Sequence, residues 1–292
     1  MINKIVHTDV LDGVKSLADK SIHLTVTSPP YNVKIDYDNH VDNAPYKDYL
    51  DWLKKIFTEV YRATVHGGRC AINIDMTANA KGQRDEEYIR AIYPHLYNLM
   101  KEIGWKFRTE ICWYKQNAVG SPTCWGSYCS NSDPFIRRNH EYVLIWSKGD
   151  WRLDGDIELS DMTKKEFETY TLSTWFITPE TRKSILSVHP APFPEELAQR
   201  IIKLFSYRGN TILDVFCGSG TVPYMSKLLG RNYIGLDNSK SYCAFARSRI
   251  ETVDGMLFKD SYVPRSERLK KTPSKRKTKK MELSEKVDLF DG

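Results

Sequence analysis

Apolar residues recur along this chain with two different periods, and each period indicates which secondary structure a segment forms. Ile22, Leu24 and Val26 alternate with polar residues, which predicts a strand that ends at residues 28–30. The apolar residues between positions 50 and 61 recur at helical spacing, and Gly67-Gly68 is expected to end that helix. The early part of the chain therefore predicts a strand followed by a helix.

The same two periods continue through most of the chain. We expect further strands at residues 69–74, 107–114, 142–146, 211–216 and 233–236, and further helices at 87–103, 194–205, 221–229 and 239–252. Between 116 and 187 the alternation weakens, and only the strand at 142–146 is clear. Strands that alternate with helices predict an α/β sandwich, and no internal repeat suggests a solenoid.

Composition narrows the class of protein. The chain has 292 residues, 41% of them hydrophobic, and no apolar run reaches the roughly 20 residues needed to cross a bilayer. The beginning of the chain does not resemble a secretory signal. The six cysteines lack the usual spacing of metal ligands. We therefore expect a cytoplasmic protein with reduced thiols, no membrane segment and no metal site.

The net charge of +6 is concentrated near the C-terminus. Residues 265–280 carry nine basic side chains against one acidic side chain, a net charge of +8, and residues 281–292 carry −3. Residues 1–264 are therefore left with a net charge of +1. A nucleic-acid-binding surface on the folded part must arise from the arrangement of charges, and the charged tail at 264–292 is expected to be disordered.

A first motif, at residues 213–221, runs from a strand through Gly218-Ser219-Gly220 into a helix. Such a turn lets a ligand approach the backbone near the start of the helix. Asp237 ends the next strand, where a carboxylate can accept hydrogen bonds from the hydroxyls of a ribose. A nicotinamide dinucleotide is a rival ligand, but its fingerprint requires a third glycine where this chain has Pro223. A purely structural turn is the other alternative.

A second motif, Ser28-Pro29-Pro30-Tyr31, follows the strand at 22–27. Two prolines cannot continue a central strand, and their fixed φ angles make a rigid platform at the carboxyl edge of the sheet. Open α/β sheets bind their ligands at this edge. The alternative is a simple loop in which Tyr31 is a core aromatic residue.

Together, the two motifs resemble those of the DNA amino-methyltransferases, which combine a Phe-x-Gly-x-Gly cofactor motif with an (Asp/Asn/Ser)-Pro-Pro-(Tyr/Phe/Trp) catalytic motif. The catalytic motif comes first in this chain, as in the beta group of that family, and this order counts against the protein-glutamine methyltransferases. The resemblance covers roughly residues 3–252. It implies a Rossmann-like, S-adenosyl-L-methionine-dependent methyltransferase fold with a circularly permuted motif order and a small inserted recognition region.

The resemblance also assigns roles to individual residues. Asp9 matches the acidic residue that binds the adenine amino group of the cofactor, and His189-Pro190 match the segment over its methionine end. Phe193 stands where many members have a lysine that pairs with the cofactor carboxylate. Residues 111–117 and 140–142 resemble segments near the base pocket. The expected cofactor-binding residues are Asp9, His189, Pro190, Asp214, Phe216, Gly218, Ser219, Gly220, Thr221 and Asp237, and the expected catalytic residues are Ser28, Pro29, Pro30 and Tyr31.

This constellation suggests a mechanism without a covalent intermediate. Ser28 Oγ and the Pro29 carbonyl would accept the hydrogens of an exocyclic amine and direct its lone pair at the methyl group. Tyr31 would stack on a base flipped out of the duplex. No cysteine follows a proline, which argues against methylation of cytosine carbon 5. In the family, serine at position 28 favours N4-methylcytosine, and N6-methyladenine is the alternative.

The motif positions divide the chain into four parts. Residues 1–115 and 188–258 are expected to form the catalytic and cofactor-binding parts of one domain, 116–187 a target-recognition region, and 264–292 the basic tail. Double-stranded DNA is the expected partner, contacted by basic residues such as Arg137, Arg138, Lys148, Lys164 and Lys165. A cognate restriction endonuclease and a homodimer are further expectations. The remaining alternatives are an RNA or protein methyltransferase, a nicotinamide-dependent oxidoreductase and a non-catalytic DNA-binding module.

Overall fold

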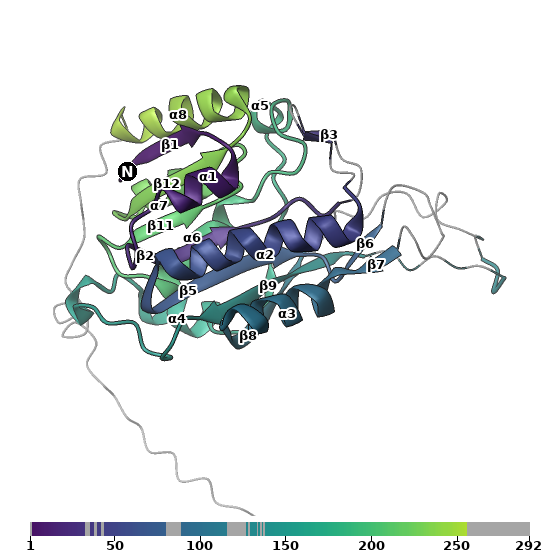
Figure 1. Ribbon diagram of the computed structural model, residues 1–292, viewed down its shortest axis with the longest axis horizontal. Helices are drawn as coiled ribbons and strands as arrows, with labels where there is room; N and C mark the ends of the chain where they lie inside the picture. Colours follow the sequence, from purple (N-terminus) through teal and green to yellow (C-terminus); the bar gives the residue numbers. More distant parts are fainter. Residues whose placement is uncertain are drawn as a thin grey trace, which may run out of the picture.

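An eight-stranded sheet with helices on both faces forms the centre of the protein (Figure 1). The computed structural model describes residues 2–32, 36–37, 40–41, 44–79, 89–115, 127, 129–132, 134, 136 and 138–255. The basic tail at 264–292 and Arg137 lie outside the described residues. The strands of the sheet are β1 (Lys4–His7), β2 (Ile22–Thr27), β5 (Thr64–Ile74), β8 (Lys106–Tyr114), β9 (His140–Ser147), β10 (Thr174–Phe176), β11 (Thr211–Asp214) and β12 (Asn232–Asp237).

The sheet is mainly parallel. Its strand order is β1-β12-β11-β2-β5-β9-β8-β10, and β9 alone among these strands runs antiparallel to its two neighbours. The carboxyl ends of the seven other strands therefore lie at one edge, together with the amino end of β9. Among the described residues, two further antiparallel strand pairs stand outside this sheet: β3 (Asp36–Tyr37) with β4 (His40–Val41), and β6 (Thr77–Asn79) with β7 (Ile89–Ala91).

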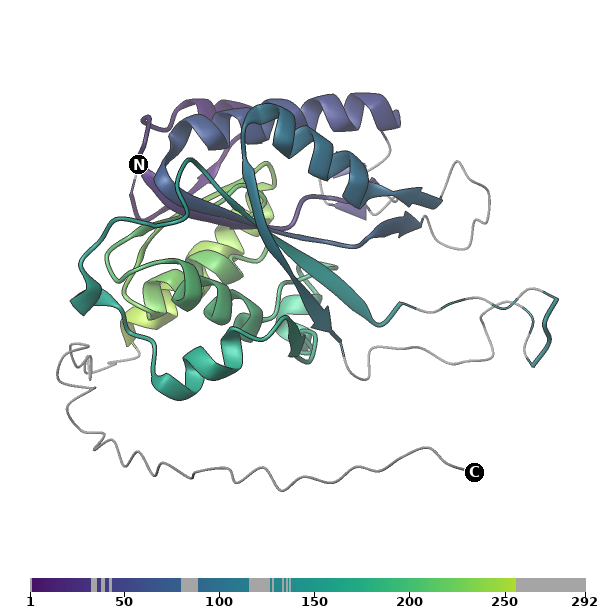
Figure 2. The same cartoon turned by 90° about the horizontal axis from the view of Figure 1, so that it is seen from below.

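Two layers of helices cover the sheet. One layer contains α1 (Val10–Lys15), α2 (Tyr46–Ala63) and α3 (Ile92–Ile103), and the other contains α6 (Glu195–Phe205), α7 (Thr221–Leu228) and α8 (Lys240–Gly255). Figure 2 shows the purple and blue helices on one side of the sheet and the green and yellow helices on the other. The shorter α4 (Lys164–Tyr170), α5 (Lys183–Leu186) and the 3-10 helix η2 (Ile157–Leu159) lie between β9 and α6 in the sequence.

The sequence of the central strands explains this three-layer arrangement. In β5, Cys70, Ile72 and Ile74 pack into the core under α2 and α3, whereas Ala71 packs into the core on the opposite face. Residues of both sets are buried, as expected for a sheet that is covered on both faces. Helix α2 contributes Leu53, Phe57 and Val60 from one face to the first core. The prediction of a Rossmann-like α/β fold is confirmed.

Most of the expected elements form close to their expected bounds, but two expectations are wrong. Gly67-Gly68 does not end α2, because α2 ends at Ala63 and β5 continues through both glycines. Gly67 has φ +72°, and a Cβ atom there would lie 2.0 Å from the Arg152 carbonyl oxygen, so close packing explains this glycine. The helix expected at 87–103 begins only at Ile92, because β7 occupies residues 89–91.

Described parts of residues 116–187, which lie between the two motifs in the sequence, belong to the same fold. Strands β9 and β10, both within residues 116–187, belong to the central sheet. Strand β1 and helix α1 also form, although the β1 segment is too short to show a clear period. Among the described residues, no helix has both the length and the apolar composition to cross a membrane.

Candidate functional site

A cavity of about 480 Å³ opens at the carboxyl edge of the sheet. Its walls include residues at or just beyond the carboxyl ends of β1, β2, β5, β8, β10, β11 and β12, and the start of β9. Thirteen of the fourteen expected site residues line it, and Gly220 is the exception. They are Asp9, Ser28, Pro29, Pro30, Tyr31, His189, Pro190, Asp214, Phe216, Gly218, Ser219, Thr221 and Asp237. The fold therefore brings two motifs, separated by more than half of the chain, to one cavity.

The two glycines of the turn after β11 are required for different structural reasons. Gly218 has φ +49°, and a Cβ atom there would lie 2.7 Å from His189 Nε2, on the opposite wall of the cavity. Gly220 has φ +77°, and a Cβ atom there would lie 2.6 Å from the Ala246 Cβ of α8. Gly218 thus allows the cavity walls to approach each other, whereas Gly220 allows α8 to pack against the turn.

Asp237 at the end of β12 is held in a fixed orientation. Its Oδ2 accepts a hydrogen bond from Gly218 N at 2.7 Å, and its Oδ1 accepts one from Ser239 N at 2.9 Å. A carboxylate has further lone pairs beyond these two contacts. Asp237 can therefore accept hydrogen bonds from ligand hydroxyls next to the glycine turn.

Asp214 connects the cofactor motif to the strand that carries the catalytic motif. Its Oδ1 accepts hydrogen bonds from Thr27 Oγ1 at 2.8 Å and from Phe216 N at 3.1 Å. Burial raises the pKa of the Asp214 carboxyl group to about 7, although both hydrogen bonds favour the charged form. The contact fixes the relative positions of β2 and β11 at the cavity.

Asp9 lies at the start of α1 and has two environments. Its Oδ1 caps the helix by accepting hydrogen bonds from Leu11 N at 2.8 Å and Asp12 N at 3.3 Å, and the side chain also lines the cavity. Nearby, the rings of Trp52 and Phe216 lie 5.5 Å apart and form an apolar part of the wall. A carboxylate beside an aromatic wall suits an adenine ring with an exocyclic amine.

The segment of residues 178–193, which we call the roof, lies across the cavity from the glycine turn. Five of its residues in sequence, His189 to Phe193, line the cavity. His189 is partly buried, its Nδ1 accepts a hydrogen bond from Ala191 N at 3.3 Å, and its ring lies 5.0 Å from that of Tyr242. Burial lowers the pKa of His189 to about 4, so the imidazole is neutral at physiological pH.

The catalytic motif forms the platform that its two prolines predict. Tyr49 donates a hydrogen bond from its hydroxyl to the Pro30 carbonyl oxygen at 2.7 Å, and Asn32, at φ +55°, donates to the Ala44 carbonyl oxygen at 3.0 Å. The Tyr31 hydroxyl lies 3.4 Å from Ser28 Oγ. These contacts hold the Ser28 hydroxyl and the Tyr31 ring at the cavity.

A polar cluster of Asn73, Lys115 and Glu141 stands behind Tyr31. Asn73 donates through Nδ2 to Glu141 Oε2 at 2.6 Å and to the Tyr31 hydroxyl at 3.1 Å, and Lys115 forms an ion pair with Glu141. Family resemblance pointed to the segments of Lys115 and Glu141 only, and Asn73 was missed. Its signal was a polar residue within the apolar run of β5, which is rare unless the side chain has partners.

Known proteins resemble this chain in sequence and in fold. A sequence model that describes the DNA methylase family matches residues 22–248. This chain belongs to that family. The type II methyltransferase M.MjaVI of Methanocaldococcus jannaschii is 36% identical over 169 residues, which cover 58% of this chain and 83% of that protein. M.HpaI of Haemophilus parainfluenzae is 25% identical over 264 residues, which cover 86% and 75%.

Solved structures of methylases have the same fold. A DNA modification methylase from Thermus thermophilus matches with a TM-score of 0.68 and 26% identity, over 85% of this chain and 94% of its own. The cytosine-N4-specific PvuII methyltransferase matches with a TM-score of 0.66 and 20% identity, over 86% and 89%. The expected methyltransferase fold and the beta group of amino-methyltransferases are confirmed. The methylase acts on DNA and uses S-adenosyl-L-methionine.

The cavity of the methylase has the size and charge that this cofactor requires. Its volume lies in the usual range of ligand pockets. Among the described residues, the charged side chains that line it are one lysine, Lys115, and five acids, Asp9, Glu141, Glu180, Asp214 and Asp237. An acidic wall attracts the cofactor, whose sulfonium and ammonium groups outweigh its carboxylate. The chemistry of the residues therefore fits the cofactor.

One basic residue expected to contact DNA has a structural role in the methylase. Lys148 donates hydrogen bonds to the carbonyl oxygens of Tyr61 and Thr64, at 2.5 and 2.8 Å, and so caps the end of α2. This use of its ammonium group contradicts a role for Lys148 in binding phosphate. Arg138 lies 3.3 Å from Asp75, and the exposed Lys164 pairs with Glu168.

Proposed function

We propose that this methylase transfers a methyl group to the N4 amino group of a cytosine flipped out of double-stranded DNA. Methylation of an exocyclic amine in DNA is the activity of its family, and the choice of cytosine is what we add. The observation that carries the finer proposal is the ammonium group of Lys115, which lines the cavity and is paired with Glu141 behind the Ser28–Tyr31 platform.

Lys115 favours cytosine over adenine as the substrate, because the two bases carry different groups near the amine. In both bases a ring nitrogen follows the amino-bearing carbon. At the next ring position cytosine has the carbonyl oxygen O2, whereas adenine has a C–H group. A lysine can donate a hydrogen bond to O2 of cytosine but finds no acceptor at the corresponding C–H group of adenine. A site built to hydrogen-bond a substrate rejects an analogue that lacks the partner.

The platform residues would act by positioning and electrostatics. Ser28 Oγ and the Pro29 carbonyl oxygen accept the two hydrogens of the amine, which directs its lone pair away from the ring. The Tyr31 ring stacks on the flipped base, and the hydrogen bond from Tyr49 to Pro30 keeps the platform rigid. When bound, S-adenosyl-L-methionine supplies the electrophilic methyl group.

The expected cofactor-binding residues would hold the cofactor beside the platform. Asp237 accepts hydrogen bonds from the ribose hydroxyls, and Asp9 accepts one from the adenine amine. His189 and Pro190 cover the methionine end from the roof. Phe193 supplies no charge there, so no lysine at this position pairs with the cofactor carboxylate.

We also propose a DNA-recognition segment, a partner enzyme and an oligomeric state. Residues 116–187 include the base-recognition segment, the enzyme protects its sites against a cognate restriction endonuclease, and two copies can associate on DNA. Resistance of DNA from cells that express the methylase to restriction enzymes with overlapping sites would test the protective role.

The product of the reaction tests the proposal directly. Plasmid DNA methylated by the purified enzyme should yield N4-methyldeoxycytidine when it is digested to nucleosides and separated by chromatography with mass detection. A peak of N6-methyldeoxyadenosine without N4-methyldeoxycytidine would overturn the cytosine assignment and leave the fold and the cofactor intact.

A variant tests the role of Lys115 separately. Lys115→Met should lower kcat/KM for DNA by about 10- to 100-fold, the loss expected for one hydrogen bond to a charged group. Cofactor affinity should change little, because the proposed contact is to the base. Lys164→Met, at an exposed lysine paired within α4, is the matched control and should retain full activity.

A further inference from the structure

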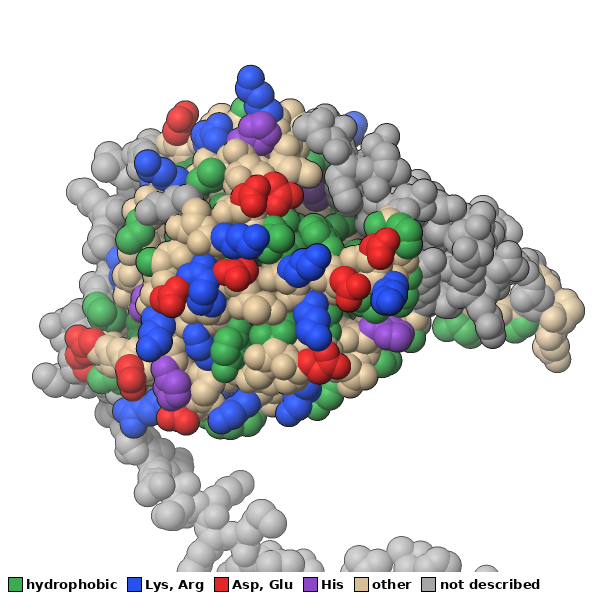
Figure 3. All heavy atoms as spheres, viewed as in Figure 1, with side chains coloured by type: hydrophobic (Ala, Val, Ile, Leu, Met, Phe, Trp, Pro, Cys, Tyr) green, Lys and Arg blue, Asp and Glu red, His purple; other side chains and the backbone are tan. Residues whose placement is uncertain are grey.

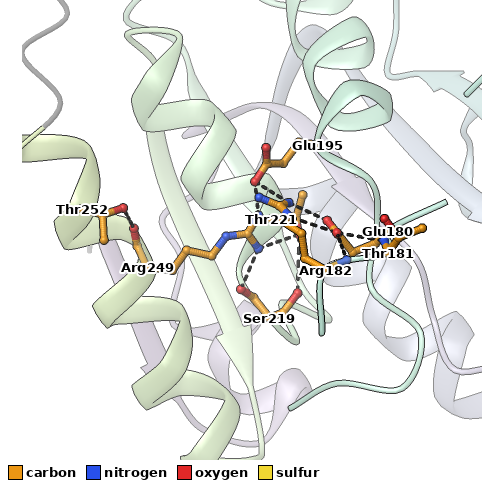
Figure 4. A network of polar contacts seen from close by, with 8 residues as sticks. All are labelled: Glu180, Thr181, Arg182, Glu195, Ser219, Thr221, Arg249 and Thr252. Carbon is orange, nitrogen blue, oxygen red and sulfur yellow. Dashed lines mark hydrogen bonds and ion pairs between the residues drawn. The ribbon is translucent and has the colours of Figure 1, made fainter. Parts of the chain in front are cut away.

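A chain of ion pairs joins the two walls of the cofactor cavity through a single carboxylate oxygen (Figure 4). Glu195, in the first turn of α6, accepts hydrogen bonds at Oε1 from Arg182 Nη2 at 2.7 Å and from Arg249 Nη2 at 2.5 Å. Arg182 belongs to the roof, and Arg249 belongs to α8. One acid of α6 therefore connects the roof, which precedes it in the sequence, to the distant helix α8.

Arg249 holds the turn after β11 through one backbone and one side-chain contact. Its Nη1 donates hydrogen bonds to the Ser219 carbonyl oxygen at 3.2 Å and to Thr221 Oγ1 at 2.9 Å, and both residues line the cavity. Its guanidinium group lies 4.7 Å from the centre of the Tyr224 ring, and the side chain is only 9% exposed. Arg249 is thus a buried cation that contacts the wall of the cofactor cavity.

Arg182 holds the opposite wall. Its Nε donates to Glu180 Oε1 at 2.9 Å and its Nη2 to Glu180 Oε2 at 2.5 Å, and the Glu180 side chain, 6% exposed, lines the cavity. The hydrogen bonds from Arg182 lower the pKa of Glu180, so this carboxyl group stays charged. The position of Arg182 therefore determines the position of Glu180 in the roof.

We propose that Glu195 is a positioning residue that fixes the distance between the roof and the turn at residues 217–221. Two guanidinium groups approach one oxygen of Glu195, so its negative charge offsets their mutual repulsion. Without that charge, Arg182 and Arg249 repel each other, and the roof moves away from the turn. The cofactor lies between these two walls, so the loss appears as weaker cofactor binding.

Binding of S-adenosyl-L-homocysteine, followed by isothermal titration calorimetry, tests the proposal on the full-length enzyme. Glu195→Gln keeps the shape of the side chain and removes its charge. We expect its Kd to rise by about 10-fold or more, consistent with the removal of a partner from hydrogen bonds between charged groups. The kcat at saturating cofactor should stay near that of the wild type, because Glu195 does not contact the proposed platform.

Glu196→Gln is the matched control. Glu196 is the neighbouring acid in the same turn of α6, is 52% exposed and pairs with Arg200 on its own helix. Its substitution should leave the Kd within about 2-fold of the wild type, because an exposed ion pair contributes little free energy. A normal Kd for Glu195→Gln, even with a lower melting temperature, would overturn the proposal and leave Glu195 a purely structural residue.

The two arginines provide a second test. If Arg182 and Arg249 act through the same oxygen, Arg182→Gln and Arg249→Gln should have non-additive effects on the Kd, with the double variant close to the weaker-binding single variant. Fully additive effects would contradict a shared role for Glu195.

The inference rests on the proposed place of the cofactor in this cavity, and Asp237→Ala separates the two. If Asp237→Ala weakens binding and Glu195→Gln does not, only the role of Glu195 is wrong. If neither variant weakens binding, the cofactor binds elsewhere and both proposals fail.

Discussion

At the scale of single residues, Asp214 gives the site a measurable dependence on pH. Burial raises the pKa of its carboxyl group to about 7 in the folded protein, above its usual value of about 3.9. Between these two values the folded protein retains a proton that the unfolded chain has released. Stability contributed by this group is therefore present at low pH, falls as pH rises through this window and stops falling above about pH 7.

Asp214→Asn should remove this dependence. The amide oxygen can still accept hydrogen bonds from Thr27 and Phe216, and the side chain no longer titrates. Relative to the wild type, the variant should gain up to about 4 kcal/mol of stability as pH rises from about 4 to about 7, at about 1.4 kcal/mol per pKa unit. Urea denaturation across this range measures the difference, and parallel curves for the two proteins would contradict it.

The sequence made most of the candidate site accessible to prediction, because most of its residues belong to two short contiguous motifs. The structure brings thirteen of the fourteen expected residues to the cavity. The polar cluster behind Tyr31 and the ion pairs of Glu195 could not be predicted in the same way. Each joins side chains that are far apart in sequence, such as Asn73 with Glu141 and Glu195 with Arg249. Local patterns carry no information about such pairs.

At the scale of elements, Gly220 in the turn between β11 and α7 allows two effects of replacing a glycine to be measured separately: backbone strain and overpacking. Gly220→Ala introduces a side chain at φ +77° and places its Cβ 2.6 Å from the Ala246 Cβ in α8. Gly209→Ala meets a similar backbone angle, +79°, but has no described atom within 4 Å of its Cβ. We expect both variants to lose about 1–2 kcal/mol from backbone strain. Gly220→Ala should lose a further 1–3 kcal/mol, roughly, from overpacking.

Chemical denaturation of the two variants measures this difference. The extra loss in Gly220→Ala reports the packing of α8 against the turn. Equal losses would mean that α8 shifts to accommodate the methyl group, and that Gly220 is required only for its backbone angle.

The elements themselves were predicted where a long periodic run determines them. Strands β2, β11 and β12 and helix α6 form close to their expected bounds. The sequence failed where a neighbouring segment decides the structure. The four-residue β1 is stabilised by pairing with β12, and Gly67 within β5 is explained by the approach of Arg152. Periodicity along one segment cannot show these partners.

At the scale of the whole molecule, the distribution of charge limits where DNA can bind. The face covered by α1, α2 and α3 carries interleaved basic and acidic side chains (Figure 3). Pairs such as Lys54 with Glu102 lie on this face. Mixed charges do not form the uniformly basic surface that attracts phosphates. We therefore expect DNA to approach the carboxyl edge of the sheet, where the cavity opens.

The basic tail should contribute affinity without specificity. A variant that lacks residues 264–292 should methylate the same sequence as the full chain, because phosphate contacts carry no base readout. If the tail binds DNA, its removal should also flatten the dependence of binding on salt, by about 0.9 logarithmic units for each phosphate that the tail neutralises. Sequencing of methylated bases and binding at several salt concentrations check both points. A changed recognition sequence in the truncated enzyme would contradict the prediction.

The acidic wall of the cavity has a consequence for successive rounds of catalysis. Glu141 and Glu180 are balanced by Lys115 and Arg182, whereas Asp9 and Asp237 add negative charge to the wall. The methyl donor carries one net positive charge, which disappears with the methyl group. A charge pair about 4 Å apart is worth about 1–4 kcal/mol between water and a protein surface. The wall therefore binds S-adenosyl-L-homocysteine less tightly than S-adenosyl-L-methionine. Replacement of the product by a new methyl donor is then favoured, and inhibition by the product is weaker than in a neutral cavity.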